Sequence, residues 1–263
     1  MAEQIRFVDG DAYEHSMAVW SAIVGEVFLD WLTPASGLSW LDVGCGSGIF
    51  TDLINRRCAP SALSGVDPSA PQLAFARRRP GAEGVDFRQG DAMALPFPDD
   101  RFDAAVMALV IVFVPEPARG VSEMARVVRP GGTVSAYMWD VLGGGLPIVL
   151  MQQVMETMGL NPPRPPNPEA SGLDAMQALW SGAGLVDVQA RVIEVQHRYD
   201  NFEAFWEMMG QMPAASDVIA RLGDAEIAAM KAELRRRLPV DARGGITHSA
   251  HANAVRGRVP QRG

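Results

Sequence analysis

The sequence predicts an α/β fold, with a doubly wound, mostly parallel sheet of seven strands and helices on both faces. Three observations lead to this prediction. Short apolar runs alternate with helical patterns along the first half of the chain. A glycine-rich turn joins the first apolar run to the first helix. Acidic residues directly follow successive apolar runs, where a parallel sheet presents its ligand-binding groups.

Five strands are expected in the first half, each at a short apolar stretch. They cover residues 39–43, 62–66, 85–88, 102–107 and 133–139. The helices expected between them cover residues 49–57, 70–79 and 116–128. Strands that alternate with helices favour parallel pairing through right-handed crossovers. The apolar run 104–114 is too short to span a bilayer as a helix, and it is typical of a buried strand with its continuation.

Three segments fall outside this alternation and are expected to form helical caps over one end of the sheet. They are residues 1–32, with apolar side chains at helical spacing; residues 143–171, with a Met-rich helix and a proline run; and residues 201–244, with two or three helices. The last two strands are expected at 186–196 and 245–255. A single domain then has its core at residues 33–142, 172–200 and 245–256, and residues 257–263 are expected to fray.

Composition narrows the class of protein. Of the 263 residues, 48% are hydrophobic and 21% are charged, as in soluble globular proteins. The net charge of −8 disfavours nucleic acid as a partner. The chain has only two cysteines, Cys45 and Cys58, which fit a reducing compartment. The N-terminus lacks the pattern of a signal peptide, so we expect a cytoplasmic protein with no integral membrane association.

The glycine-rich turn has the sequence Asp-Val-Gly-Cys-Gly-Ser-Gly over residues 42–48. Its glycines permit a tight turn and let a ligand approach the backbone closely, and the following helix offers unpaired N–H groups. A dinucleotide fingerprint would place glycine at position 49, where this chain has Ile49. The turn alone is a weak signal, because it could simply join a strand to a helix.

Three acidic residues add context to the turn. Asp42 precedes the glycines, Asp67 ends the second strand 19 residues after Gly48, and Asp91 ends the third strand. A carboxylate at the position of Asp67 can accept hydrogen bonds from both hydroxyls of a ribose. Asp67 and Asp91 could instead be helix caps or turn residues. Together the three acids indicate one polar ligand across the carboxyl edge of the sheet.

In order and spacing, these motifs resemble the Rossmann-like class I S-adenosylmethionine-dependent methyltransferases. The similarity is greatest to the branch that includes the ubiquinone and menaquinone C-methyltransferases. It covers residues 40–137 and rests on the motifs Leu41–Gly48, Val66–Ser69, Gly90–Ala92, Leu95–Phe97 and Arg129–Gly132. Several motifs in register are far more specific than any one of them.

The resemblance implies that S-adenosylmethionine is the cofactor. Gly44, Cys45 and Gly46 would line its methionine part, and Asp42 would lie near its ammonium group. The N-terminal stretch resembles the lid of the family, with the lid residues Tyr13, Trp20 and Ser21.

The same resemblance assigns the adenosine part of the cofactor. Asp67 would hold the ribose, and Pro68 would pack on the adenine. Asp91 would accept a hydrogen bond from the adenine amino group, with the backbone of Ala92 beside it. Two residues at the end of the fourth strand would close the pocket near the sulfonium: Met107 and Ala108.

Catalytic residues are harder to assign, because methyl transfer depends mainly on alignment and needs a base only if the acceptor atom must lose a proton. Asp140 follows the fifth strand and is the candidate base. No metal site is expected, because the four histidines are scattered, at His15, His197, His248 and His251.

The leading hypothesis is a methyltransferase that acts on a small, partly apolar acceptor, as a monomer or a homodimer. An NAD(P)-dependent oxidoreductase is the first alternative, which Asp67 fits and Ile49 does not. A non-catalytic S-adenosylmethionine-binding protein is the second. Nucleic-acid amino methyltransferases carry a polar-proline motif after the fourth strand. This chain has the apolar residues Ala108–Ile111 there, which counts against that class of methyltransferase.

Overall fold

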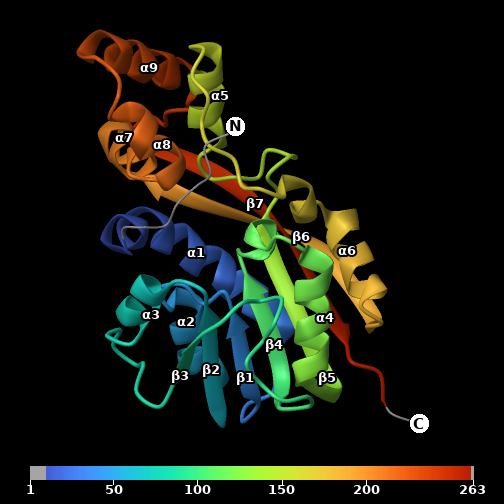
Figure 1. Cartoon of the computed structure of the whole chain (residues 1–263). Helices are drawn as coiled ribbons and strands as arrows, with labels where there is room; N and C mark the ends of the chain where they lie inside the picture. Colours follow the sequence, from blue (N-terminus) through green and yellow to red (C-terminus); the bar gives the residue numbers. More distant parts are fainter. Residues whose placement is uncertain (1–9, 262–263) are drawn as a thin grey trace.

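The computed structural model describes the backbone of residues 10–261 and the side chains of residues 17–261. A seven-stranded sheet with helices on both faces runs through this part of the chain (Figure 1). The strands are β1 (Ser39–Val43), β2 (Ala62–Asp67), β3 (Asp86–Gln89), β4 (Phe102–Ala108), β5 (Val128–Trp139), β6 (Val186–Tyr199) and β7 (Ile246–Arg258). The helices are α1 (Gly10–Leu32), α2 (Ile49–Cys58), α3 (Ala70–Ala76), α4 (Pro117–Val127), α5 (Val149–Thr157), α6 (Leu173–Gly182), α7 (Phe202–Gly210), α8 (Pro213–Ile219) and α9 (Asp224–Arg237). The predicted fold class is confirmed.

The strand order is β3-β2-β1-β4-β5-β7-β6. Strands β1 to β5 pair in parallel, β7 is antiparallel to β5, and β6 is antiparallel to β7. The chain winds outward from β1 in one direction through β2 and β3, and then returns to β4 on the other side. The order therefore reverses between β1 and β4, and α/β sheets bind ligands at the carboxyl ends of the strands at such a point.

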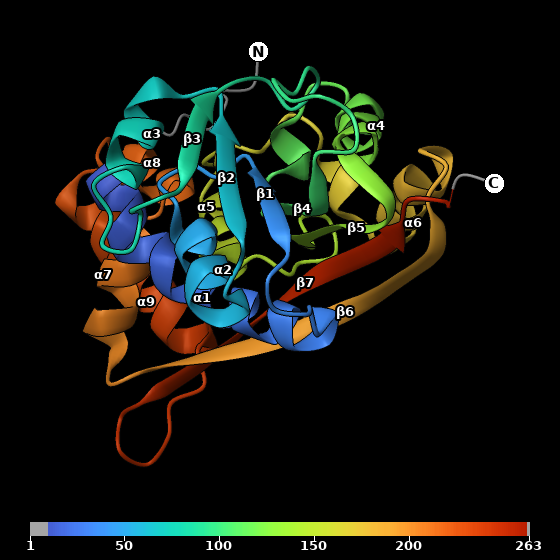
Figure 2. The same cartoon turned by 90° about the horizontal axis from the view of Figure 1, so that it is seen from below.

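Helices cover the two faces of the sheet (Figures 1 and 2). Helices α1, α2 and α3 lie on one face, and α4 and α6 lie on the other. Helix α1 packs along α2 and β6, and its residues Trp20, Val24 and Phe28 are fully buried. The ring of Phe28 lies 4.6 Å from that of Tyr137 in β5. The first expected cap segment is thus also part of the core.

The other caps lie beyond the carboxyl edge of the parallel strands. Strand β5 ends at Trp139, which pairs with Ala252, whereas the pairing of β6 with β7 continues to Tyr199 and Ile246. The β6–β7 ribbon therefore projects past the edge, and helices α7, α8 and α9 connect its two strands. Helix α5 contacts α8 and α9 there (Figure 1).

Helix α6 was not indicated by the sequence pattern. It packs on the sheet through the buried Trp180, whose Nε1 donates a hydrogen bond to the carbonyl oxygen of Val134 at 2.9 Å. The expectation that residues 257–263 fray is wrong at its start, because Gly257 and Arg258 pair with β5. A Cβ atom on Gly257 would lie 3.1 Å from the Trp180 ring, so α6 packs directly on this end of β7.

Residues 129–132 form an irregularity inside β5 rather than a turn before it. The pairing of β4 with β5 shifts register between Phe102 and Ala104, opposite this segment. Pro130 has no N–H to donate and Gly131 has φ of 80°, so a bulge is the place in a strand that accepts both.

Candidate functional site

A cavity of about 340 Å³ lies at the carboxyl ends of β1, β2, β3 and β4, a size within the range of small-molecule sites. Ser21 of α1, Phe50 of α2 and Tyr137 of β5 also line it. Ten of the expected cofactor-binding residues contribute to its wall: Ser21, Asp42, Gly44, Cys45, Gly46, Asp67, Pro68, Asp91, Ala92 and Ala108. The motifs that are separate in the sequence therefore meet at one cavity.

The glycine turn bends as its sequence requires. Gly44, Gly46 and Gly48 have φ values of 76°, 53° and 84°, which favour glycine. The N–H groups of Gly44 and Cys45 both donate to the carbonyl oxygen of Val66, at 2.7 and 3.0 Å. A Cβ atom on Gly44 would lie 2.6 Å from the side chain of Val110, so the turn also lets the segment after β4 approach closely.

Asp67 is held across this turn from the end of β2. Its Oδ2 accepts a hydrogen bond from the N–H of Gly46 at 2.9 Å, and its Oδ1 accepts one from that of Ser69 at 2.8 Å. Burial raises the pKa of the Asp67 carboxyl, and these two hydrogen bonds oppose the rise. Each carboxylate oxygen can accept a second hydrogen bond, so Asp67 retains capacity for a ligand.

Asp42 is fully buried at the end of β1. Its Oδ2 accepts a hydrogen bond from the hydroxyl of Thr51 at 2.7 Å, whereas its Oδ1 has no partner among the described residues. Burial raises the pKa of Asp42 to about 7; the Thr51 hydrogen bond opposes the rise, and the charge of Asp67 adds to it. A buried carboxyl with one free oxygen is costly, and a positively charged or hydrogen-bond-donating ligand would relieve that cost.

Other buried polar atoms on the cavity wall also lack a partner within the described part of the chain. They are Ser21 Oγ, Ser47 Oγ and Gln72 Oε1, in addition to Asp42 Oδ1. Buried polar atoms in proteins are nearly always hydrogen-bonded. Their gathering around one cavity indicates a polar ligand with several hydrogen-bonding groups.

Pro68 and Asp91 also line the cavity, and both are exposed, unlike the buried Asp42. Asp91 Oδ1 accepts a hydrogen bond from the N–H of Met93 at 2.8 Å, which fixes the turn after β3. The wall beside Asp91 is formed by Ala92, Val114 and Pro115. A flat, mostly apolar group with a polar edge would fit here.

Three of the expected cofactor-binding residues are not placed on the cavity wall. Met107 is fully buried and its Cε lies toward Gly120 of α4, because successive residues of a strand face opposite sides and Ala108 takes the cavity side. Trp20 faces away from the cavity, and its Nε1 donates to the hydroxyl of Tyr199 at 3.1 Å. The side chain of Tyr13 lies outside the described residues.

Several wall residues could not be found from motifs. Gln72 of α3 lines the cavity and Thr51 of α2 supports it from behind by donating to Asp42, and neither is marked by a motif in the sequence. Leu109, directly after β4, has φ of 61°, where a leucine carries a strain of about 1 kcal/mol. Its N–H donates to the carbonyl oxygen of Tyr137 at 2.8 Å. Such strain is often found at functional sites.

Asp140, the candidate base, is not among the cavity wall residues. Its Oδ1 accepts a hydrogen bond from the N–H of Gly143 at 2.8 Å, and its Oδ2 lies 3.6 Å from Nε2 of His251. These contacts close a glycine-rich turn after β5. The described side chains contain no group of His, Cys, Asp and Glu residues that could hold a metal ion.

Comparison with known proteins connects this cavity to a family. Residues 41–136 match the model of the methyltransferase domain family. A phosphatidylethanolamine N-methyltransferase from Cereibacter sphaeroides is 43% identical over 104 residues, which are 38% of this chain and 50% of that protein. The ubiquinone/menaquinone biosynthesis C-methyltransferase UbiE from Ruegeria sp. is 35% identical over 121 residues, 44% of this chain and 48% of the relative. The matched segment spans half or less of the length of these curated relatives.

Solved structures agree at the level of the fold. The YcgJ protein from Bacillus subtilis aligns with a TM-score of 0.60 and 20% identity, over 91% of this chain and 99% of that protein. These comparisons confirm the resemblance to the class I S-adenosylmethionine-dependent methyltransferases. Among the described residues, no helix has both the length and the apolar character to cross a membrane.

Proposed function

We propose that this chain, whose residues 41–136 are a methyltransferase domain, is an S-adenosylmethionine-dependent methyltransferase that acts on a small, partly apolar acceptor. The observation that carries the proposal is the buried Asp42 carboxyl on the cavity wall, whose Oδ1 has no partner among the described residues and which shares that wall with two further motif acids. This arrangement suits a ligand with an ammonium group, a ribose and a flat base.

When bound, S-adenosylmethionine supplies a methyl carbon attached to a positively charged sulfur. Asp42 would accept hydrogen bonds from the ammonium group, beside the backbone of Gly44, Cys45 and Gly46. Asp67 would bind the ribose hydroxyls through its free lone pairs. Asp91 would accept from the amino group of the adenine, against Pro68 and the backbone of Ala92.

The chain would then align the acceptor and exclude water, and these two effects account for most of the catalysis of such a transfer. In this proposal one domain has its core at residues 33–142, 172–200 and 245–256, and residues 1–32, 143–171 and 201–244 form the acceptor pocket. In the lid of this proposal, Ser21 would face the cofactor, Trp20 would hold the lid helix against Tyr199, and Tyr13 would close over the cofactor. The partly buried Leu146, Phe202 and Trp206 of the caps would give the pocket an apolar character.

Asp140 would serve as a base only for an acceptor that must lose a proton. The proposal also places the protein in the cytoplasm, as a monomer or a homodimer without a nucleic-acid partner. Both of its cysteines are buried and free, which fits a reducing compartment.

Titration calorimetry with S-adenosylmethionine, S-adenosylhomocysteine, NAD and NADP tests the cofactor. We expect the adenosyl compounds alone to bind, and Asp67→Ala to weaken their binding by at least about 1–3 kcal/mol. Asp86→Ala is the matched control, because Asp86 only pairs with Arg88 at the surface. Binding of NAD instead would favour an oxidoreductase. Binding without transfer to any acceptor would favour a non-catalytic binding protein.

A further inference from the structure

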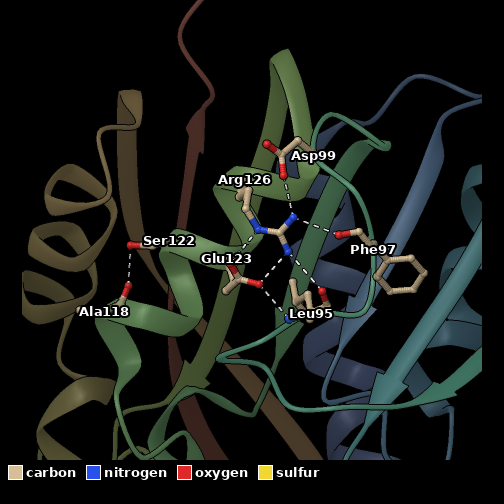
Figure 3. Close-up of polar contacts among 7 residues, drawn as sticks. All are labelled: Leu95, Phe97, Asp99, Ala118, Ser122, Glu123 and Arg126. Atoms are coloured by element: carbon tan, nitrogen blue, oxygen red, sulfur yellow. Dashed lines mark hydrogen bonds and ion pairs between the residues drawn. The ribbon is translucent and has the colours of Figure 1, made fainter.

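Arg126 of α4 uses all five of its guanidinium N–H groups. Its Nε and Nη2 donate to the two carboxylate oxygens of Glu123, each at 2.7 Å. Nη2 also donates to the carbonyl oxygen of Leu95 at 3.1 Å. Nη1 donates to the carbonyl oxygen of Phe97 at 3.0 Å and to Asp99 Oδ1 at 2.7 Å (Figure 3). Three of these acceptors belong to one segment, residues 95–99.

Glu123 completes this clamp from the same helix. Its Oε2 accepts a hydrogen bond from the N–H of Leu95 at 2.8 Å, so both backbone groups of Leu95 are held by α4 (Figure 3). The hydrogen bonds between the two side chains, together with their opposite charges, lower the pKa of the Glu123 carboxyl and raise that of the Arg126 guanidinium. A planar guanidinium fixes several acceptors in set directions, which a lysine ammonium cannot do.

The clamped segment lies directly behind the cavity wall. The chain from β3 to β4, residues 90–101, contains neither a helix nor a strand of the sheet, although its residues Gly90, Asp91 and Ala92 line the cavity. A Cβ atom on Gly90 would lie 3.1 Å from Pro96, inside the clamped segment. The N–H of Ala94 donates to the carbonyl oxygen of Asp91 at 3.0 Å, so the turn at Asp91 continues into Leu95.

Helix α4 contacts the same wall at a second point. A Cβ atom on Gly120, one turn before Glu123, would lie 3.2 Å from Val114 and 4.0 Å from Ala92. One rigid helix therefore supports the wall through Gly120 and holds the loop through Arg126 and Glu123. The exposed Asp91 carboxylate is held to its turn by the N–H of Met93, and that turn packs on Pro96 through Gly90, so the position of the carboxylate depends on the clamped segment.

We propose that Arg126 is a positioning residue that fixes residues 95–99 to α4. In this way it holds Asp91 and Ala92 in the position in which they contact the base of the cofactor, and it so determines the preference for adenine. This inference rests on the proposed function. A loop without its own secondary structure opens readily when its tertiary bonds are lost. A ligand would then have to order the loop on binding, and the discrimination that depends on Asp91 would weaken.

The test compares Arg126→Lys with the wild-type chain. The ligands are S-adenosylhomocysteine and S-inosylhomocysteine, which has a 6-oxo group in place of the amino group. We expect Arg126→Lys to weaken binding of the adenosyl compound at least fivefold and to change binding of the inosyl compound much less, so that the ratio of the two dissociation constants shrinks. Arg129→Lys is the matched control, because Arg129 pairs with Asp103 at the start of β4, and it should leave the ratio within twofold.

Hydrogen exchange of the ligand-free protein gives an independent readout. Amides of residues 93–100 should exchange at least tenfold faster in Arg126→Lys, with those of β4 and β5 unchanged. An equal loss of affinity for both ligands, or an unchanged ratio, would overturn the inference while leaving the proposed function in place. Absence of binding to the wild-type chain would overturn the proposed function and the inference with it. If Arg126→Lys does not fold, Glu123→Gln is measured by the same criteria.

Discussion

At the scale of single residues, Asp42 is the group at the site whose negative charge is least favoured by its surroundings. Its carboxyl is fully buried, one of its oxygens lacks a partner among the described residues, and its pKa is raised to about 7. An ammonium group beside it would favour the carboxylate and lower that pKa again. Ligand binding and the ionisation of Asp42 are therefore coupled.

This coupling predicts a pH-dependent affinity for S-adenosylhomocysteine. Below pH 7 the free protein holds a proton on Asp42 that binding must release, so the affinity should fall up to about tenfold per pH unit as the pH is lowered. Calorimetry at pH 6, 7 and 8, in buffers of different ionisation enthalpy, would measure both the affinity and the released proton. Asp42→Asn should bind weakly and show a flatter profile. Equal affinity of the wild-type chain at pH 6 and pH 8 would contradict the coupling.

Two glycines of the turn allow a matched comparison. Gly44 and Gly46 both have positive φ, but a Cβ atom would meet Val110 only at Gly44 and has open space at Gly46. Gly44→Ala should therefore lower the free energy of unfolding by about 2–4 kcal/mol, and Gly46→Ala by about 1 kcal/mol. Urea denaturation measures the difference. If both variants lost the same free energy of unfolding, the close approach of Val110 to Gly44 would not contribute to stability.

At the scale of elements, a buried aromatic cluster joins α1 to the caps. Trp20 donates to the hydroxyl of Tyr199 on β6, and that hydroxyl lies 3.5 Å from the sulfur of Met208 on α7. The Trp20 ring also packs edge-on against Trp139, His197 and His248. Ser21, the next residue of α1, lines the cavity. This cluster connects the cavity wall to the helices over the carboxyl edge.

Trp20→Phe should weaken that connection. The loss of a buried hydrogen bond and of ring volume should lower the free energy of unfolding by about 1–3 kcal/mol and speed amide exchange in α1. Trp31→Phe, on the same helix, is the control, because Trp31 is only partly buried and packs under Arg256 at 4.8 Å from the ring. Exchange in α1 that is equally fast in both variants would argue against a special role of the cluster.

Local patterns were sufficient to predict most elements and ten of the residues that line the cavity. Strands β1, β2 and β4 and the turn at Gly44 are each marked by an apolar run next to a glycine or an acid, and these signals need no distant partner. Helix α6 has only two buried residues, Met176 and Trp180, which is too weak a stripe to recognise. Its position depends on the distant strands β5 and β7.

The remaining site residues depend on packing that no motif records. Trp20 and Ser21 are neighbours on one helix and point in directions about 100° apart, so how the helix packs decides which of them faces the cavity. The left-handed backbone of Leu109 and the hydrogen bond from Thr51 to Asp42 likewise arise from contacts between elements. The motifs therefore predicted residues of the cavity wall better than the residues that support them.

At the scale of the whole molecule, two sets of buried groups make stability depend on pH in opposite directions. Burial raises the pKa of Asp42 and Asp67, so the folded state holds their protons more tightly than the unfolded chain, and both groups make stability fall as the pH rises. For Asp42, whose pKa is raised from 3.8 to about 7, this fall extends from about pH 4 to about pH 7. Burial lowers the pKa of His197 and His248, so stability falls as the pH drops below about 6.5. The balance between these two sets of groups decides the pH at which the protein is most stable.

Asp42→Asn separates the two contributions. Folding raises the pKa of Asp42 from its ordinary value of 3.8 to about 7. Each pKa unit corresponds to about 1.4 kcal/mol. Because asparagine carries no charge, the free energy of unfolding of the variant should be higher by on the order of 4 kcal/mol above pH 7. The gain should shrink to about 1 kcal/mol or less at pH 4, where the carboxyl of the unfolded wild-type chain also takes up a proton. The pH of maximum stability should move upward, because the histidine contribution remains.

Urea denaturation of both proteins at pH 4, 6 and 8 measures this gain, with Asp86→Asn as a surface control that should show no such trend. A gain that is the same at every pH would mean that the charge of Asp42 does not cause it. If the variant is more stable at pH 8 and also binds S-adenosylhomocysteine weakly, both effects follow from the loss of the Asp42 charge. The buried charge of Asp42 then lowers the stability of the ligand-free protein, and the ammonium group of the bound ligand stabilises that charge.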